Sequence, residues 1–145
     1  MRKGALILGS YGNFGKYIAR TLLSQNIPVI LSGRNSDSLR RLQTTLQNEY
    51  PQAQIPTSII DVNQILTSDL TGISPKVVIN TCGPFQTANY RVVEKCIESS
   101  TNYIDLADGR QFVAGMNKYN ESAIAKNVTI ITGASSVPGL SSAVL

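Results

Sequence analysis

The chain has 145 residues, 42% of them hydrophobic, so it can bury one hydrophobic core and is about one domain long. Its net charge of +4 is spread along the sequence and only 6% of the residues are aromatic, which argues against a nucleic-acid partner. The absence of histidine excludes Ser-His-Asp and Cys-His hydrolase sites and histidine-based zinc sites within this chain, and two cysteines cannot form a four-thiolate metal site. No apolar run is long enough to span a bilayer, so we expect no membrane association and a soluble, cytoplasmic protein.

The first predicted element is a buried strand near residues 4–9, followed by a glycine-rich turn and a helix. Glycines in such a turn permit positive φ, let backbone N–H groups approach a pyrophosphate and allow the helix to pack closely on the sheet. The start of the helix adds unpaired N–H donors and a partial positive charge. The pattern predicts a dinucleotide phosphate site, with a purely structural glycine turn as the alternative. The predicted contacts are Gly9, Ser10, Tyr11, Gly12, Asn13, Phe14 and Gly15.

The end of the second predicted strand, near residues 28–32, indicates which dinucleotide is bound. An NAD-binding unit carries Asp or Glu there for the ribose 2′-hydroxyl, whereas this chain has Ser32, Gly33 and Arg34. A serine hydroxyl and a guanidinium suit a 2′-phosphate, which a carboxylate would repel. We therefore predict that NADP(H) is preferred over NAD(H). The alternative is that Arg34 is a solvated charge before a helix that Asn35 or Ser36 caps.

Strands and helices alternate through the rest of the chain. Further strands are predicted near residues 54–60, 76–80, 102–106 and 128–132, and helical spacing of apolar residues occurs at 39–50, 88–97 and 112–123. A helix within 61–70 is left open. This alternation predicts an α/β, doubly wound Rossmann fold: a six-stranded parallel sheet of order 3-2-1-4-5-6 with helices on both faces. Pro56 agrees with an edge position for the third strand, because proline lacks a ladder donor.

In this fold a ligand lies outside the carboxyl ends of the strands, where the strand order reverses. Asp61 and Val62, after the third strand, are predicted to meet the adenine. The turn after the fourth strand is predicted to lie near the nicotinamide ribose, with ordinary turn chemistry as the alternative throughout. Its predicted contacts are Thr81, Cys82, Gly83 and Pro84.

Two cysteines and two aspartates, Cys82 among the predicted contacts, need no catalytic role. Cys82 and Cys96 are expected to be small core hydrophobes rather than a disulfide or a nucleophile. Asp105 and Asp108 are ionisable, but turn capping explains them better than catalysis. We therefore assign no catalytic residue and no metal ligand.

Five motifs along the chain are informative together. They are Gly-x-x-Gly-x-x-Gly at 9–15, Ser-Gly-Arg at 32–34, Asn-x-x-Gly-Pro-Phe at 80–85, Tyr-Ile-Asp-Leu-Ala-Asp-Gly-Arg at 103–110 and Gly-Ala-Ser-Ser-Val-Pro-Gly-Leu-Ser at 133–141. This set resembles the NADP-binding N-terminal domain of the saccharopine dehydrogenase (saccharopine reductase-like) family. The resemblance implies a pyridine-nucleotide oxidoreductase that moves hydride to or from a carbon bearing a secondary amine.

Family enzymes are substantially longer than this chain, and a second domain supplies most substrate contacts and the dimer surface. We expect residues 1–133 to form the NAD(P)-binding domain and 134–145 to begin that second domain, which makes the chain a fragment that is inactive alone. The resemblance implies a small, amino-acid-derived substrate (a secondary amine or imine) and a full-length homodimer. Two alternatives are a non-catalytic NADP(H)-sensing module and an atypical short-chain dehydrogenase/reductase. The latter is disfavoured because no tyrosine here is followed by lysine four residues later.

Overall fold

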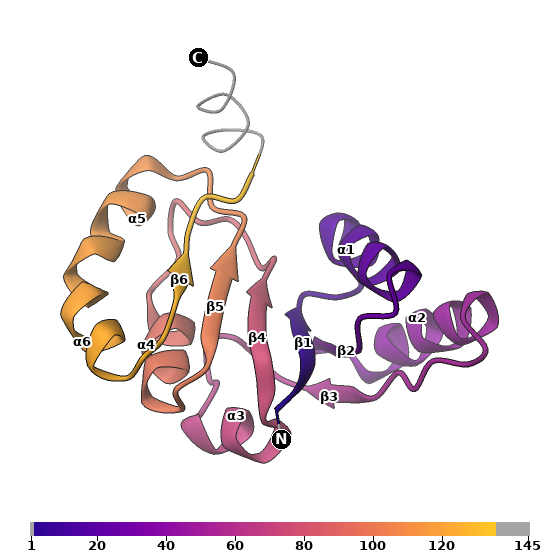
Figure 1. Cartoon of the computed structure of the whole chain (residues 1–145). Helices are drawn as coiled ribbons and strands as arrows, with labels where there is room; N and C mark the ends of the chain where they lie inside the picture. Colours follow the sequence, from indigo (N-terminus) through magenta and orange to yellow (C-terminus); the bar gives the residue numbers. More distant parts are fainter. Residues whose placement is uncertain (1, 136–145) are drawn as a thin grey trace.

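The computed structural model describes residues 2–135 and contains one parallel sheet of six strands in the order β3-β2-β1-β4-β5-β6 (Figure 1). This order and the helices on both faces confirm the predicted doubly wound Rossmann fold. The strands are β1 (Lys3–Leu8), β2 (Val29–Gly33), β3 (Thr57–Ile59), β4 (Pro75–Asn80), β5 (Asn102–Asp105) and β6 (Ile130–Ile131).

Strand β3 is shorter than predicted and lies at the sheet edge, as the proline had suggested. Pro56 directly precedes β3, and its carbonyl accepts a hydrogen bond of 2.9 Å from the N–H of Leu31 in β2. Proline can accept a ladder bond but cannot donate one, and its missing N–H is tolerated here because Pro56 lies just before the first residue of β3, where the ladder begins.

One face of the sheet is covered by α1 (Asn13–Ser24) and α2 (Ser36–Glu49), which pack over β1 and β2. Alternate strand residues such as Ile7 and Leu31 are fully buried under these two helices. Burying each such side chain contributes about 1.5–3 kcal/mol. These contacts hold the first turn of α1 above the carboxyl end of β1 (Figure 1).

The opposite face carries the remaining helices, and one predicted helix is broken there. The spacing at 112–123 predicted a continuous helix, but the structure divides it at Gly115. The Tyr90 hydroxyl donates a 2.9 Å hydrogen bond to the carbonyl of Phe112, which a regular α-helix would use for its own ladder. The elements on this face are α3 (Thr67–Ile73), α4 (Arg91–Glu98), α5 (Arg110–Gly115), the 3₁₀ helix η1 (Met116–Tyr119) and α6 (Asn120–Ala125).

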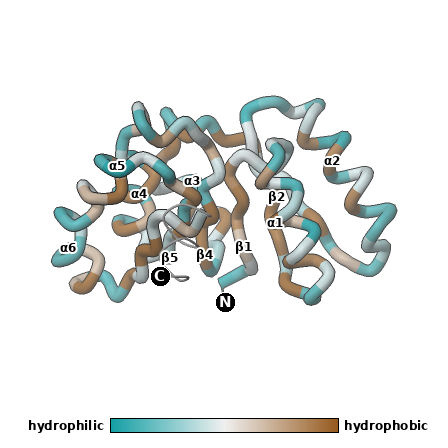
Figure 2. Tube along the Cα trace, turned by 90° about the horizontal axis from the view of Figure 1, so that it is seen from above, coloured by the Kyte–Doolittle hydropathy of each residue, from teal (hydrophilic) through white to brown (hydrophobic). Residues whose placement is uncertain are grey.

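Within residues 2–135 no helix covers β4, β5 and β6 on the side that carries α1 and α2 (Figure 1). Ile131 is 47% exposed there, and the α1 side chains Phe14 and Tyr17 are 67% and 74% exposed. Figure 2 shows hydrophobic residues concentrated along the central strands. Parallel sheets are normally covered on both faces, so this half of the sheet presents an open apolar surface.

No helix among the described residues is long and apolar enough to cross a membrane. Those residues also hold no cluster of three or more His, Cys, Asp or Glu side chains that could bind a metal ion.

Candidate cofactor-binding site

The glycine turn between β1 and α1 is compact because its glycines touch backbone or neighbouring loops. Gly9 has φ +78°, and a Cβ there would lie 2.7 Å from Thr81 Oγ1 and 3.0 Å from Cys82 Sγ. The N–H of Gly12 donates to the Gly9 carbonyl at 3.0 Å, and a Cβ on Gly15 would overlap that same carbonyl. Side chains at these positions would force the turn apart or push α1 off the sheet.

The first turn of α1 presents backbone donors with no protein acceptor. The first bond in the helix runs from Lys16 N–H to the Gly12 carbonyl, and no described residue accepts from the N–H of Asn13, Phe14 or Gly15. The N-cap residue Gly12 has no capping side chain, and the first turn carries no acidic residue. Three free N–H groups at the positive end of a 12-residue helix form a site for an anion.

Ser10 fixes this turn to the neighbouring strand. Its buried hydroxyl donates to the Ile7 carbonyl at 2.6 Å and accepts from the Ser32 N–H at 2.7 Å. The N–H groups of Gly9 and Ser10 both donate to the Ser32 carbonyl. Because the polar atoms of Ser10 are paired within the protein, its direct contact with a cofactor stays a prediction.

The end of β2 combines an unpaired hydroxyl with an unpaired cation. Ser32 Oγ is the one buried side-chain polar atom that lacks a partner among the described residues. Arg34 is exposed and makes no ion pair with any residue of 2–135. Tyr11 reaches across from the glycine turn and lies against Gly33. Ser32, Gly33 and Arg34 are the positions predicted to bind a ribose 2′-phosphate.

The strand ends that follow β3 and β4 meet this region. Burial raises the pKa of the Cys82 thiol to about 11, while the Arg34 charge opposes this and Asp61 adds to it, so the three residues lie within electrostatic reach of one another. The Asp61 carboxylate accepts from the N–H of Asn63 at 2.9 Å, and Thr81 donates its hydroxyl to the Leu8 carbonyl at 2.7 Å.

The other predicted rim residues surround these groups. Val62 is half-buried against the core cluster of the α3–α4 face, and Gly83 and Pro84 are exposed in the loop after β4. A thiol with a raised pKa is a poor nucleophile at neutral pH, which agrees with the core interpretation of Cys82. Burial also raises the pKa of Cys96, which is fully buried.

A buried network that the sequence did not predict joins the loops after β4, β5 and β6. The Asp105 carboxylate accepts from the N–H groups of Ala107 and Gly133 and from the Thr132 hydroxyl, which confirms its expected role as a turn cap. It also accepts from the Tyr103 hydroxyl at 2.9 Å. The signal that could have found this network is the alternation along β5, which places Tyr103 and Asp105 on one face.

Asn80 extends the network to the loop after β4. Its Nδ2 donates to the Tyr103 hydroxyl at 3.3 Å, and its Oδ1 accepts from the Cys82 N–H at 3.0 Å. Burial raises the pKa of Tyr103, so its hydroxyl keeps its proton for the bond to Asp105. The network sets the positions of the rim loops and leaves no free carboxylate for catalysis among its members.

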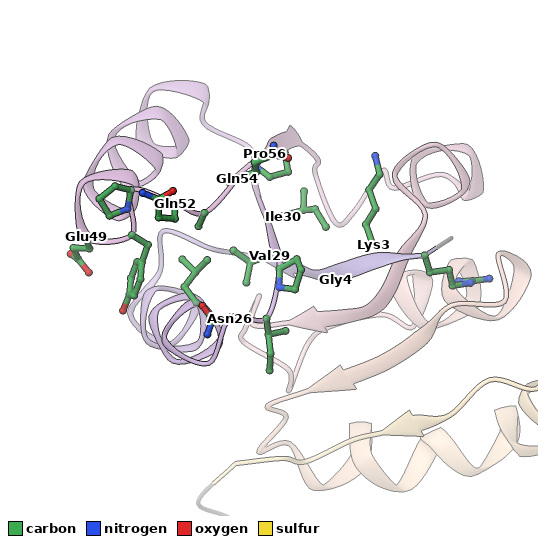
Figure 3. Close-up of a pocket in the computed structure, with 16 residues that line it drawn as sticks. Lys3, Gly4, Asn26, Val29, Ile30, Glu49, Gln52, Gln54 and Pro56 are labelled. Atoms are coloured by element: carbon green, nitrogen blue, oxygen red, sulfur yellow. The ribbon is translucent and has the colours of Figure 1, made fainter.

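A cavity of about 900 Å³ lies at the amino-terminal ends of the strands, away from the predicted cofactor site (Figure 3). It is lined by residues at the amino ends of β1 and β2, including Lys3, Gly4 and Val29, and by the segment after α2. None of its lining residues belongs to the predicted cofactor site.

The strand order and the glycine turn between β1 and α1 define a dinucleotide-binding Rossmann domain. The sequence matches the family described as the saccharopine dehydrogenase NADP-binding domain over residues 5–131, and the chain belongs to that family. NADP is accordingly its cofactor, in agreement with the preference predicted from the end of β2.

Curated relatives support the same family. A saccharopine dehydrogenase-like oxidoreductase of Mus musculus is 26% identical over 92% of this chain and 34% of its own length. A probable mitochondrial saccharopine dehydrogenase-like oxidoreductase of Arabidopsis thaliana is also 26% identical, over 92% of this chain and 32% of its own length. The chain thus spans about a third of these relatives.

Solved structures show the same fold. Apo saccharopine dehydrogenase (L-Glu forming) from Saccharomyces cerevisiae superposes with a TM-score of 0.70 at 18% identity, covering 96% of this chain and 28% of that one. An NADPH-bound short-chain oxidoreductase from Pseudomonas aeruginosa superposes with a TM-score of 0.65 at 13% identity, covering 88% and 70%.

Proposed function

We propose that this domain binds NADP(H) with its pyrophosphate on the first turn of α1. The observation that carries the proposal is the set of three N–H groups, on Asn13, Phe14 and Gly15, that have no acceptor among the described residues. The N-cap residue Gly12 has no side chain to cap these donors, and the helix dipole favours a negative charge there. The other residues of the glycine turn would then lie alongside the pyrophosphate.

The two ends of the cofactor extend along the rim on either side. Arg34 would hold the 2′-phosphate beside Gly33, since a free, exposed guanidinium is well suited to it. Ser32 is fully buried, so its contact with the phosphate rests on the sequence pattern alone. Asp61 and Val62 would border the adenine. The nicotinamide ribose would lie along the loop after β4, at Thr81, Cys82, Gly83 and Pro84.

The bound nicotinamide supplies hydride chemistry, and the residues of this chain bind and orient it. We propose that the complete oxidoreductase acts on a small amino-acid-type substrate, a secondary amine or imine. We also propose that residues 134–145 lead into a substrate and dimerisation domain, although residues 136–145 lie outside the described part. The length of the relatives and the open apolar side of β4–β6 support this. A cytoplasmic location stays a prediction, and the Arabidopsis relative is named as mitochondrial.

Cofactor binding is tested by isothermal titration of the chain with NADPH and NADH. We expect NADPH to bind at least tenfold more tightly, the ratio for about 1.4 kcal/mol. Failure to bind NADPH, or tighter binding of NADH, would contradict the proposal.

The role of α1 is tested by Asn13→Pro. Asn13 is the first helical residue, after the extended residue Gly12, so proline fits there and removes the N–H donor together with the Asn13 side chain. Loss of a charge-assisted hydrogen bond, about 1.5–3 kcal/mol, would weaken NADPH and NADH alike. Asn13→Ala, which keeps the N–H, is the matched control. Unchanged affinity in the proline variant would show that the pyrophosphate lies elsewhere.

A further inference from the structure

Tyr11 of the glycine turn crosses to the beginning of α2. Its hydroxyl oxygen accepts the backbone N–H of Arg34 and that of Asn35, each at 3.0 Å. Its ring lies against the end of β2, where a Cβ on Gly33 would overlap it. The side chain therefore joins the turn of the pyrophosphate site to the strand end of the 2′-phosphate site.

The tyrosine oxygen occupies an anion-favouring position. Both of its donors immediately precede α2, a 14-residue helix whose N-cap side chain, Asn35 Oδ1, accepts from the Ser38 N–H at 2.8 Å. The positive end of a helix favours acceptors and negative charge at this point. The unpaired Ser32 hydroxyl and the unpaired Arg34 cation belong to the same strand end.

The proton of the Tyr11 hydroxyl has no acceptor among the described residues, although its oxygen accepts two hydrogen bonds. Hydrogen bonds in a chain polarise one another, so an oxygen that accepts two N–H groups becomes a stronger O–H donor. The free donor stands next to Arg34 and within the predicted cofactor rim.

We propose that Tyr11 is a specificity-determining residue, whose hydroxyl donates a hydrogen bond to the cofactor 2′-phosphate and conveys to it the polarity of the α2 amides. This inference rests on the proposed function, because it assumes that the 2′-phosphate lies at Arg34. A phosphate gains more from such a donor than a neutral ribose hydroxyl does, because hydrogen bonds to charged groups are stronger. Tyr11 would thus strengthen the preference for NADP that Arg34 confers.

The test compares Tyr11→Phe with the unchanged chain, using 2′,5′-ADP and 5′-ADP as probes in isothermal titration. Phenylalanine keeps the ring on Gly33 and removes only the hydroxyl. We expect 2′,5′-ADP to bind about tenfold more weakly, while 5′-ADP stays within about twofold. Tyr17→Phe is the matched control, since Tyr17 is exposed on α1.

A second readout is the ³¹P chemical shift of bound 2′,5′-ADP as a function of pH. A hydrogen bond to the dianion lowers the pKa of the 2′-phosphate, so removal of the hydroxyl should raise that pKa. A packing defect elsewhere in the turn would leave it unchanged.

Equal weakening of both probes by Tyr11→Phe would reduce Tyr11 to a structural role, and tighter binding of 2′,5′-ADP would show that the hydroxyl competes with the phosphate. Either result overturns the inference. If the unchanged chain prefers 2′,5′-ADP and Arg34→Ala abolishes that preference while Tyr11→Phe does not, only the role of Tyr11 fails. If the unchanged chain shows no preference, the proposed function fails with it.

Discussion

Arg34→Ala should separate the two nicotinamide cofactors. Arg34 directly follows β2, is exposed, and makes no ion pair within residues 2–135, so its removal should leave stability within about 0.5 kcal/mol. A hydrogen bond to a charged group is worth about 1.5–3 kcal/mol, and every 1.4 kcal/mol is tenfold in affinity. NADPH should therefore bind roughly 10- to 150-fold more weakly, while NADH, which has no 2′-phosphate, should be nearly unaffected.

The assay is parallel isothermal titration of both cofactors, with thermal melting as a check on folding. Arg40→Ala is the matched control, because Arg40 is an exposed arginine on α2 and its substitution removes the same charge. Added salt should weaken NADPH binding of the unchanged chain more than that of Arg34→Ala. Equal weakening of NADPH and NADH, or an equal effect of Arg40→Ala, would refute the assignment of the 2′-phosphate to Arg34.

Two further predictions concern the supporting structure. Ser10→Ala should lower the free energy of unfolding, measured by urea denaturation, by about 1–3 kcal/mol, because it leaves the buried Ser32 N–H without its acceptor. Ser24→Ala, at an exposed serine, is the control. An equal effect of the two substitutions would contradict this prediction. Cys82, with its pKa raised to about 11, should react with iodoacetamide near pH 8 about a hundredfold more slowly in the folded chain than in urea. Rapid labelling of folded Cys82 in peptide mass spectrometry would show that the thiol is not buried as described.

The fold was largely predictable because its signals are local. Short apolar strands alternating with helical spacing permit few topologies once crossovers are right-handed, and Pro56 marked the edge. The broken helix at Gly115 was not predictable from spacing, because its cause is a hydroxyl from a distant residue, Tyr90. The short α3 gave too weak an apolar pattern to be identified.

The candidate site was predictable in its positions but not in the roles of its side chains. The glycine spacing and the absence of a carboxylate at the end of β2 are both visible in the sequence. The strand order then brings these segments together at the carboxyl ends of the strands. The sequence did not show that Ser10 is committed to Ser32, or that Tyr11 reaches the start of α2. Both contacts join residues more than twenty positions apart, and a hydroxyl in a glycine turn has the same appearance in the sequence whether it faces a ligand or the protein.

The most direct test of the account is a ¹H–¹⁵N correlation NMR titration of the chain with NADPH. We expect the largest shifts at the free amides of Asn13, Phe14 and Gly15 and at the strand end around Arg34, with only the α1 set shifting comparably in NADH. Shifts confined to the cavity beside Lys3, at the amino-terminal ends of the strands, or no shifts at any site, would contradict cofactor binding at the glycine turn.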